Sequence, residues 1–96
     1  MKVNDIMKIL REHKEVLKRY GVKRIGVFGS AVRGELGEES DIDFIFEFEE
    51  GKKNFDNFIE LAFFLEGIFG RKVDLLAREG ISGFIKPYVE REVCYA

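Results

Sequence analysis

The 96-residue chain lacks several features that define whole classes of protein. It has no apolar run approaching the roughly 18 residues that a membrane-spanning helix needs. Its first residues, Met1 to Asp5, contain no apolar stretch of the kind that forms a secretory signal peptide. Its one cysteine, Cys94, has no second cysteine with which to form an internal disulfide. These absences argue against a membrane protein or a disulfide-stabilised secreted domain, and they predict a cytoplasmic protein.

Other residue types are equally scarce. Pro87 is the only proline, and no linker, repeat or low-complexity tract divides the chain, so we predict a single domain over residues 1–96. Glutamine, threonine and tryptophan are absent while Lys, Glu and Arg dominate the polar residues, which is typical of thermophilic proteins. The formal net charge of −2 argues against bulk electrostatic binding of nucleic acid, so we expect no direct nucleic-acid partner.

The charged residues that are present are distributed unevenly. Residues 1–34 contain nine basic and three acidic residues, a net charge of +6. Residues 35–60 contain ten acidic residues and two lysines, a net charge of −8. This pattern fits a solvated helix followed by an acidic loop. It also fits a second interpretation, in which some of the acids converge on a cation.

Hydrophobic periodicity predicts three helices and four strands. The expected helices cover residues 3–20, 54–69 and 87–91, and the expected strands cover residues 23–28, 41–48, 71–77 and 93–95. Gly21 and Gly70 follow the two long helices, and Asn54 is a plausible cap at the start of the second one. The element order is typical of a two-layer α/β (α+β) domain.

The strand over residues 41–48 shows the clearest alternation in the chain. Four apolar side chains share one of its faces: Ile42, Phe44, Phe46 and Phe48. Asp41, Asp43, Ile45 and Glu47 share the opposite face. We therefore expect a small mixed sheet with helices packed on its aromatic face and with acids on the other face.

A glycine–serine pair follows the strand over residues 23–28. Gly29 permits close backbone approach, Ser30 offers a hydroxyl, and unpaired N–H groups at the following helical turn would favour an anion. Arg33, one turn later, could reach the same anion. The alternative is an ordinary turn between two elements.

Three carboxylates form the second candidate group. Asp41 and Asp43 point the same way on one strand, and such a pair repels unless a cation lies between them. Asp74 interrupts an apolar strand and would add a third carboxylate. Oxygen ligands of this kind suit Mg²⁺ or Mn²⁺. The alternatives are solvated surface acids and, for Asp74, an ion pair with Arg71 or Lys72.

Taken together, these motifs resemble the signature of the DNA polymerase β-like nucleotidyltransferases. The residues that carry the resemblance are Gly29-Ser30-Ala31-Val32-Arg33-Gly34, then Ser40-Asp41-Ile42-Asp43-Phe44, and Asp74 on a later strand. In size and order the chain is most similar to the minimal nucleotidyltransferases (MNT proteins) of archaea and bacteria. The resemblance covers roughly residues 3–95 and implies the nucleotidyltransferase palm fold.

The resemblance also implies roles for individual residues. Asp41 and Asp43 would hold two Mg²⁺ ions, with Mn²⁺ as a substitute, and Asp74 would hold one ion and help to deprotonate the acceptor hydroxyl. Gly29 and Ser30 would bind the β- and γ-phosphates of ATP. Arg33 would assist them or anchor the loop through an acid such as Glu35, and Ser40 would order the turn before Asp41.

The small size of the chain predicts an acceptor site that depends on a partner or on a second copy. MNT proteins are similar in this respect and are paired with a helical HEPN toxin, to which some transfer AMP. The resemblance therefore implies a nucleotidyltransferase antitoxin that modifies a hydroxyl of a HEPN partner. Three alternatives stay open: a non-catalytic antitoxin that acts by contact, a small-molecule nucleotidyltransferase, and a homodimer that builds a shared acceptor pocket.

Overall fold

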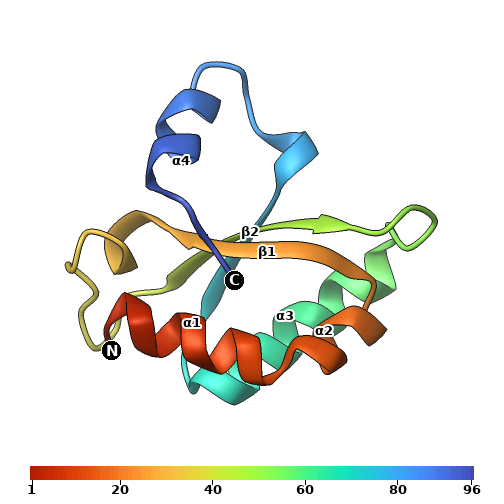
Figure 1. Ribbon diagram of the computed structural model, residues 1–96, viewed down its shortest axis with the longest axis horizontal. Helices are drawn as coiled ribbons and strands as arrows, with labels where there is room; N and C mark the ends of the chain where they lie inside the picture. The colour runs from red at the N-terminus through yellow and green to blue at the C-terminus, as the bar shows by residue number, and fades with distance from the viewer.

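A computed structural model describes residues 1–96 (Figure 1). Its elements, in chain order, are α1 (Val3–Glu12), α2 (Lys14–Arg19), β1 (Val22–Phe28), η1 (Gly29–Ala31), β2 (Ile42–Phe48), α3 (Phe55–Phe69), β3 (Val73–Ala77), η2 (Arg78–Gly80), α4 (Lys86–Glu92) and β4 (Cys94–Tyr95). All four predicted strands and all three predicted helical regions are present, with boundaries that shift by one or two residues. None of the helices combines the length and the hydropathy needed to cross a lipid bilayer.

The four strands form one mixed sheet in the order β3-β2-β1-β4. β1 pairs antiparallel with β2 and with β4, and β2 pairs parallel with β3. The long α3 helix connects the two parallel strands, as a crossover between parallel neighbours requires. This order places the start of β2 between the end of β1 and the start of β3, and these three strand ends position the candidate site.

One face of the sheet forms the hydrophobic core. Ile42, Phe44 and Phe46 of β2 are 0–1% exposed, and the α1, α2 and α3 helices lie across this face (Figure 1). Asn54 caps α3 by accepting a hydrogen bond from the Asn57 N–H at 2.8 Å, and Gly70 ends it with a φ of +66°. The small mixed sheet with helices on its aromatic face is therefore confirmed.

The short α4 helix lies on the other side of the sheet (Figure 1). Two ion pairs tie it to that side: Glu92 pairs with Arg33, and Glu90 pairs with Arg78, which also contacts Glu47 of β2. Ile45, on the acidic face of β2, is fully buried although it lies outside the main core. α4 thus covers part of the face on which we expected the acids, and it lies on the same side of the sheet as Ile45.

The predicted helix over residues 3–20 is divided at His13. The His13 backbone is not helical, with φ −108° and ψ +20°. Its ring Nδ1 lies 2.8 Å from the Ile9 carbonyl oxygen, and the ring packs edge-on against Phe64. A side chain that bonds to a carbonyl of the i→i−4 ladder is a known cause of such breaks. The prediction of one continuous helix was therefore wrong at this residue.

Candidate active site

Two of the predicted carboxylates are direct neighbours across a pair of parallel strands. Asp43, the second residue of β2, is in register with Asp74, the second residue of β3. Neighbouring strands lie about 4.8 Å apart, so side chains on the same face of paired residues stand side by side. Asp43 is half-buried and Asp74 is exposed, so the pair opens to solvent. The tertiary structure thereby joins two acids that are 31 residues apart in the chain.

Asp41 lies just before β2 and is exposed. It shares its side of the chain with Asp43, and its negative charge acts on the Asp43 carboxyl. The three aspartates nevertheless do not form a finished cage, because no group of three or more His, Cys, Asp or Glu side chains is arranged to hold a metal ion. The structure therefore brings Asp43 and Asp74 together and leaves Asp41 at the rim.

The environment of Asp43 disfavours its ionised form. Burial first, and then the charge of Asp74 and a hydrogen bond with it, raise the pKa of Asp43 from 3.8 to about 6, with a further contribution from the charge of Asp41. Arg33 acts in the opposite direction. At neutral pH the group is thus a carboxylate held against its own electrostatic preference. A cation at this position would relieve the repulsion between the carboxylates.

This donor set fits a magnesium ion. Mg²⁺ prefers oxygen ligands, and it is commonly held by one or two carboxylates while substrate phosphates and water complete its shell. Asp43 and Asp74 supply those carboxylates on an open surface, and Asp41 can contribute from the rim.

Gly29 lies against the Asp43 carboxylate. It follows β1 directly, is buried, and has a φ of +74°, a conformation that side-chain-bearing residues rarely adopt. A Cβ atom at this residue would clash with Oδ2 of Asp43. The predicted glycine therefore has two tasks: it turns the chain at the end of β1, and it leaves room for the carboxylate beside it.

Arg33 and the Gly29 N–H both contact a residue that the sequence analysis missed. Glu92, at the end of α4, accepts a hydrogen bond from the Gly29 N–H at 3.2 Å and pairs with Arg33 at 2.6 Å. Arg33 also pairs with Glu35 at 2.7 Å. It therefore anchors the loop, which is one of the two roles predicted for it. Nothing local in the sequence indicates the contact with Glu92, because Glu92 follows Arg33 by 59 residues.

The loop that leads into β2 is held by three further hydrogen bonds. Ser40 accepts a hydrogen bond from the Gly37 N–H at 3.0 Å, which confirms that it orders the turn before Asp41. Arg71 donates to the carbonyl oxygens of Gly37 and Ser40 at 2.9 and 3.2 Å. Arg71 therefore serves the loop, and neither it nor Lys72 forms an ion pair with Asp74. The simple ion-pair explanation for Asp74 is thereby removed.

Comparison with known proteins identifies relatives of the whole chain. The family model for the nucleotidyltransferase domain matches residues 10–95. Protein adenylyltransferase MntA of Thermococcus cleftensis is 45% identical over 94 residues, which cover 97% of this chain and 94% of that protein. A Methanocaldococcus jannaschii protein is 44% identical over 96 residues, which cover 97% of this chain and 96% of that protein. It is provisionally named a protein adenylyltransferase.

Solved structures share the fold. A provisionally named minimal nucleotidyltransferase superposes with a TM-score of 0.83 at 32% identity, covering 98% of this chain and 95% of that one. Two toxin–antitoxin complexes share the fold at lower identity. One, with AMP-PNP, has a TM-score of 0.68 at 24% identity and covers 99% of this chain and 72% of that one. The other, of Shewanella oneidensis, pairs an MNT antitoxin with a tri-AMPylated HEPN toxin, with a TM-score of 0.58 at 23% identity and coverages of 96% and 66%.

The family match spans most of the chain, and the named relatives match it over nearly their whole length. The chain therefore belongs to the nucleotidyltransferase domain family, as a minimal nucleotidyltransferase related to the protein adenylyltransferases.

Proposed function

We propose that this enzyme transfers AMP from ATP to a hydroxyl of a partner protein, in a reaction that depends on Mg²⁺. The observation that carries the proposal is the side-by-side placement of Asp43 and Asp74 on an open face, next to the turn at Gly29 and Ser30. An open acidic pair beside an anion-binding turn fits a nucleoside triphosphate with its divalent ion. The fit to a nucleotide donor also agrees with the family to which the chain belongs.

Each residue of the candidate site has its own proposed role in AMP transfer. Asp43 and Asp74, joined by Asp41 at the rim, would hold the ions, which when bound stabilise the negative charge that develops on the phosphates. Ser30 would donate its hydroxyl hydrogen to a phosphate oxygen. The acceptor oxygen forms a bond to the α-phosphorus, and the bond from that phosphorus to the bridging oxygen breaks, releasing pyrophosphate. Asp74, the exposed member of the pair, takes the proton from the acceptor hydroxyl.

A HEPN-type toxin is the partner that we propose. The relatives are named protein adenylyltransferases, and a protein of the same fold forms a complex with an AMPylated HEPN toxin. The face beside the site also offers an exposed apolar surface to a partner, because Ile85 and Tyr88 line a pocket with Gly29 and Arg33 and are 47% and 68% exposed. We place the reaction in the cytoplasm, where a lone unpaired cysteine stays reduced.

The direct test incubates the purified protein with ATP, Mg²⁺ and its HEPN partner. We expect the intact mass of the partner to increase by one or more AMP units, and tandem mass spectrometry to place them on hydroxyl-bearing side chains. Omission of Mg²⁺, or replacement of ATP by AMP, should leave the mass unchanged. If no mass gain occurs with Mg²⁺ or Mn²⁺ and any of the four nucleoside triphosphates, the proposal is wrong.

Ser30 provides a narrower prediction about the donor. None of the hydrogen bonds in the structure involves its hydroxyl, whereas the Gly29 N–H and Arg33 are already engaged by Glu92. Ser30→Ala should therefore raise the KM for ATP roughly tenfold, the effect of one lost hydrogen bond to a charged group, while the melting temperature stays unchanged. Steady-state kinetics at varied ATP concentration measure this effect. An unchanged KM would remove Ser30 from the phosphate site.

A second candidate function is neutralisation of the toxin by contact alone. It is favoured by Glu92, whose carboxylate already satisfies the Gly29 N–H and Arg33 without any nucleotide. The double variant Asp41→Asn/Asp43→Asn separates the two functions in a growth assay with the co-expressed toxin. Catalysis predicts that the double variant no longer protects the cells, whereas neutralisation by contact predicts full protection.

A further inference from the structure

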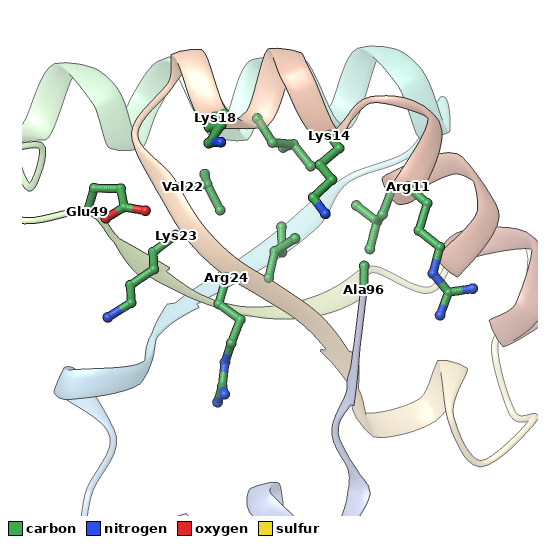
Figure 2. A pocket seen from close by; sticks show the side chains of 11 residues that line it. Arg11, Lys14, Lys18, Val22, Lys23, Arg24, Glu49 and Ala96 are labelled. Atoms are coloured by element: carbon green, nitrogen blue, oxygen red, sulfur yellow. The ribbon is translucent and has the colours of Figure 1, made fainter.

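A basic pocket lies at the opposite end of β1 from the candidate active site (Figure 2). It has a volume of about 240 Å³ and is bounded by the α1 and α2 helices, the first half of β1 and the chain terminus at Ala96. Five cationic side chains line it: Arg11, Lys14, Lys18, Lys23 and Arg24. Glu49 is the only acidic residue among them. Neither the proposed reaction nor the family match explains this concentration of positive charge.

Four of the five cations have no anionic partner within the chain. Arg24 pairs with Glu47 at 3.6 Å and lies over the Tyr95 ring at 3.7 Å. None of the others takes part in any ion pair of the structure, although Arg33, Arg78 and Lys53 all do so elsewhere. The three from the helices, Arg11 of α1 and Lys14 and Lys18 of α2, line the same pocket. Because no acid of the chain pairs with them, they are available to an external anion.

The shape of the pocket argues against a small-molecule ligand. Ligand pockets usually enclose about 300–1,000 Å³, more than this pocket offers. Its floor is made by core residues that are at most 6% exposed, namely Leu10, Leu17, Val22 and Ile25. No aromatic side chain lines it, so it has no surface on which a nucleic-acid base could stack. A shallow apolar floor inside a basic rim fits the side chains of an acidic protein segment.

The adjoining sheet edge is available to such a segment. β4 pairs only with Gly26 and Val27 of β1, and the Ala96 N–H adds one bond to the Ile25 carbonyl oxygen. On the side away from β2, residues 22–24 of β1 therefore have no strand beside them. Figure 2 shows the Lys23 and Arg24 side chains extending from this part of β1, below the Lys14 side chain on the helix. Main-chain pairing and charge could thus act together on one extended acidic segment.

We propose that this pocket, together with the free half of the β1 edge, docks an acidic segment of a partner protein. The interaction is independent of the chemistry at Asp43, because it uses the other end of the strand. Complementary charge would speed the encounter of the two proteins and fix their relative orientation. Removal of the cations should consequently weaken association without changing the reacting groups.

The test measures binding of a short fluorescein-labelled peptide of glutamate and leucine residues to the full chain by fluorescence anisotropy. Lys14→Glu/Lys18→Glu should bind the peptide roughly tenfold more weakly than the wild type, and binding by the wild type should weaken as salt is added. The single variant Lys23→Glu, which changes β1 instead of the helices, should weaken binding in the same direction. Both variants alter exposed side chains, and circular dichroism checks that they are folded.

The matched control is Lys8→Glu/Arg19→Glu, which makes the same charge change on α1 and α2 at exposed residues outside the pocket. It should leave the affinity for the peptide within about twofold of the wild type, apart from weak long-range effects. An equal loss of peptide affinity in the control and in the pocket variants would overturn the proposal, as would the absence of peptide binding by the wild type. Tighter binding of a single-stranded oligonucleotide at the same residues would assign the pocket to nucleic acid and would also overturn it.

Discussion

Asp43→Asn is expected to reduce AMP transfer by about a thousandfold or more, which corresponds to ~4 kcal/mol of transition-state stabilisation. Asparagine keeps the size of the side chain but removes a charged ligand from the centre of the site, where Asp43 adjoins both Asp74 and Gly29. The measurement is the initial rate of AMP incorporation into the partner protein at saturating ATP. Asp56→Asn, the same chemical change at an exposed residue in the first turn of α3, should retain the wild-type rate.

The same substitution is expected to stabilise the metal-free protein at pH 7.5. Because the pKa of Asp43 is raised to about 6, the folded chain holds this proton more tightly than the unfolded chain does. The stabilising contribution of the group is therefore complete below about pH 3.8 and is lost as the pH rises through about 6. Asp43→Asn removes the repulsion and should add about 1 kcal/mol at pH 7.5, an amount reduced for the partial exposure of the group.

Urea unfolding without divalent ions measures this difference at pH 7.5 and again at about pH 2.5, where the carboxyl is protonated in the unfolded chain as well. The two proteins should have the same stability at the lower pH, because the Asp43 carboxyl is then neutral in both the folded and the unfolded chain. Addition of Mg²⁺ at pH 7.5 should stabilise the wild type and have little effect on the variant. A variant that is inactive and also less stable at pH 7.5 would show that Asp43 supports the fold instead of the reaction.

Gly29→Ala is the second substitution with a large expected effect. A left-handed conformation costs an alanine about 1–2 kcal/mol, and Gly29 has a φ of +74°. The added methyl group also clashes with Oδ2 of Asp43, so the carboxylate must move. We expect a loss of about 2–3 kcal/mol in unfolding free energy from the two causes together. Displacement of Asp43 by about 1 Å should lower the transfer rate about a hundredfold in the protein that remains folded.

Gly34→Ala is the matched control for this substitution. Gly34 has nearly the same backbone conformation, with a φ of +73°, but no atom lies within 4 Å of the Cβ that alanine would add. It should lose only the conformational cost of about 1 kcal/mol and should keep its transfer rate within about twofold. Equal loss of activity in both variants would show that the contact between Gly29 and Asp43 has no special role in the site.

Local sequence patterns were sufficient for most of the secondary structure. The apolar side chains at every second residue, Ile42, Phe44 and Phe46, predicted β2 and its core face, because side-chain direction in a strand follows a period of two. The break at His13 escaped prediction, since it depends on the ring bonding to the Ile9 carbonyl oxygen and packing against Phe64 of another helix. The coverage of the acidic face by α4 escaped prediction for the same kind of reason: it depends on ion pairs with distant residues.

In the candidate site, too, some features were visible in the sequence and others only in the structure. Gly29, Ser30, Asp41 and Asp43 lie within one short stretch, so a motif can reveal them together, and the sequence by itself determined the family and its chemistry. The strand register confirms the predicted placement of Asp74 beside Asp43. Only the tertiary structure decided that Glu92 holds the Gly29 N–H and Arg33, and that five cations gather at the far end of β1. These contacts join residues that are distant in the chain, and their formation depends on strand register and helix packing, which no local pattern of residues specifies.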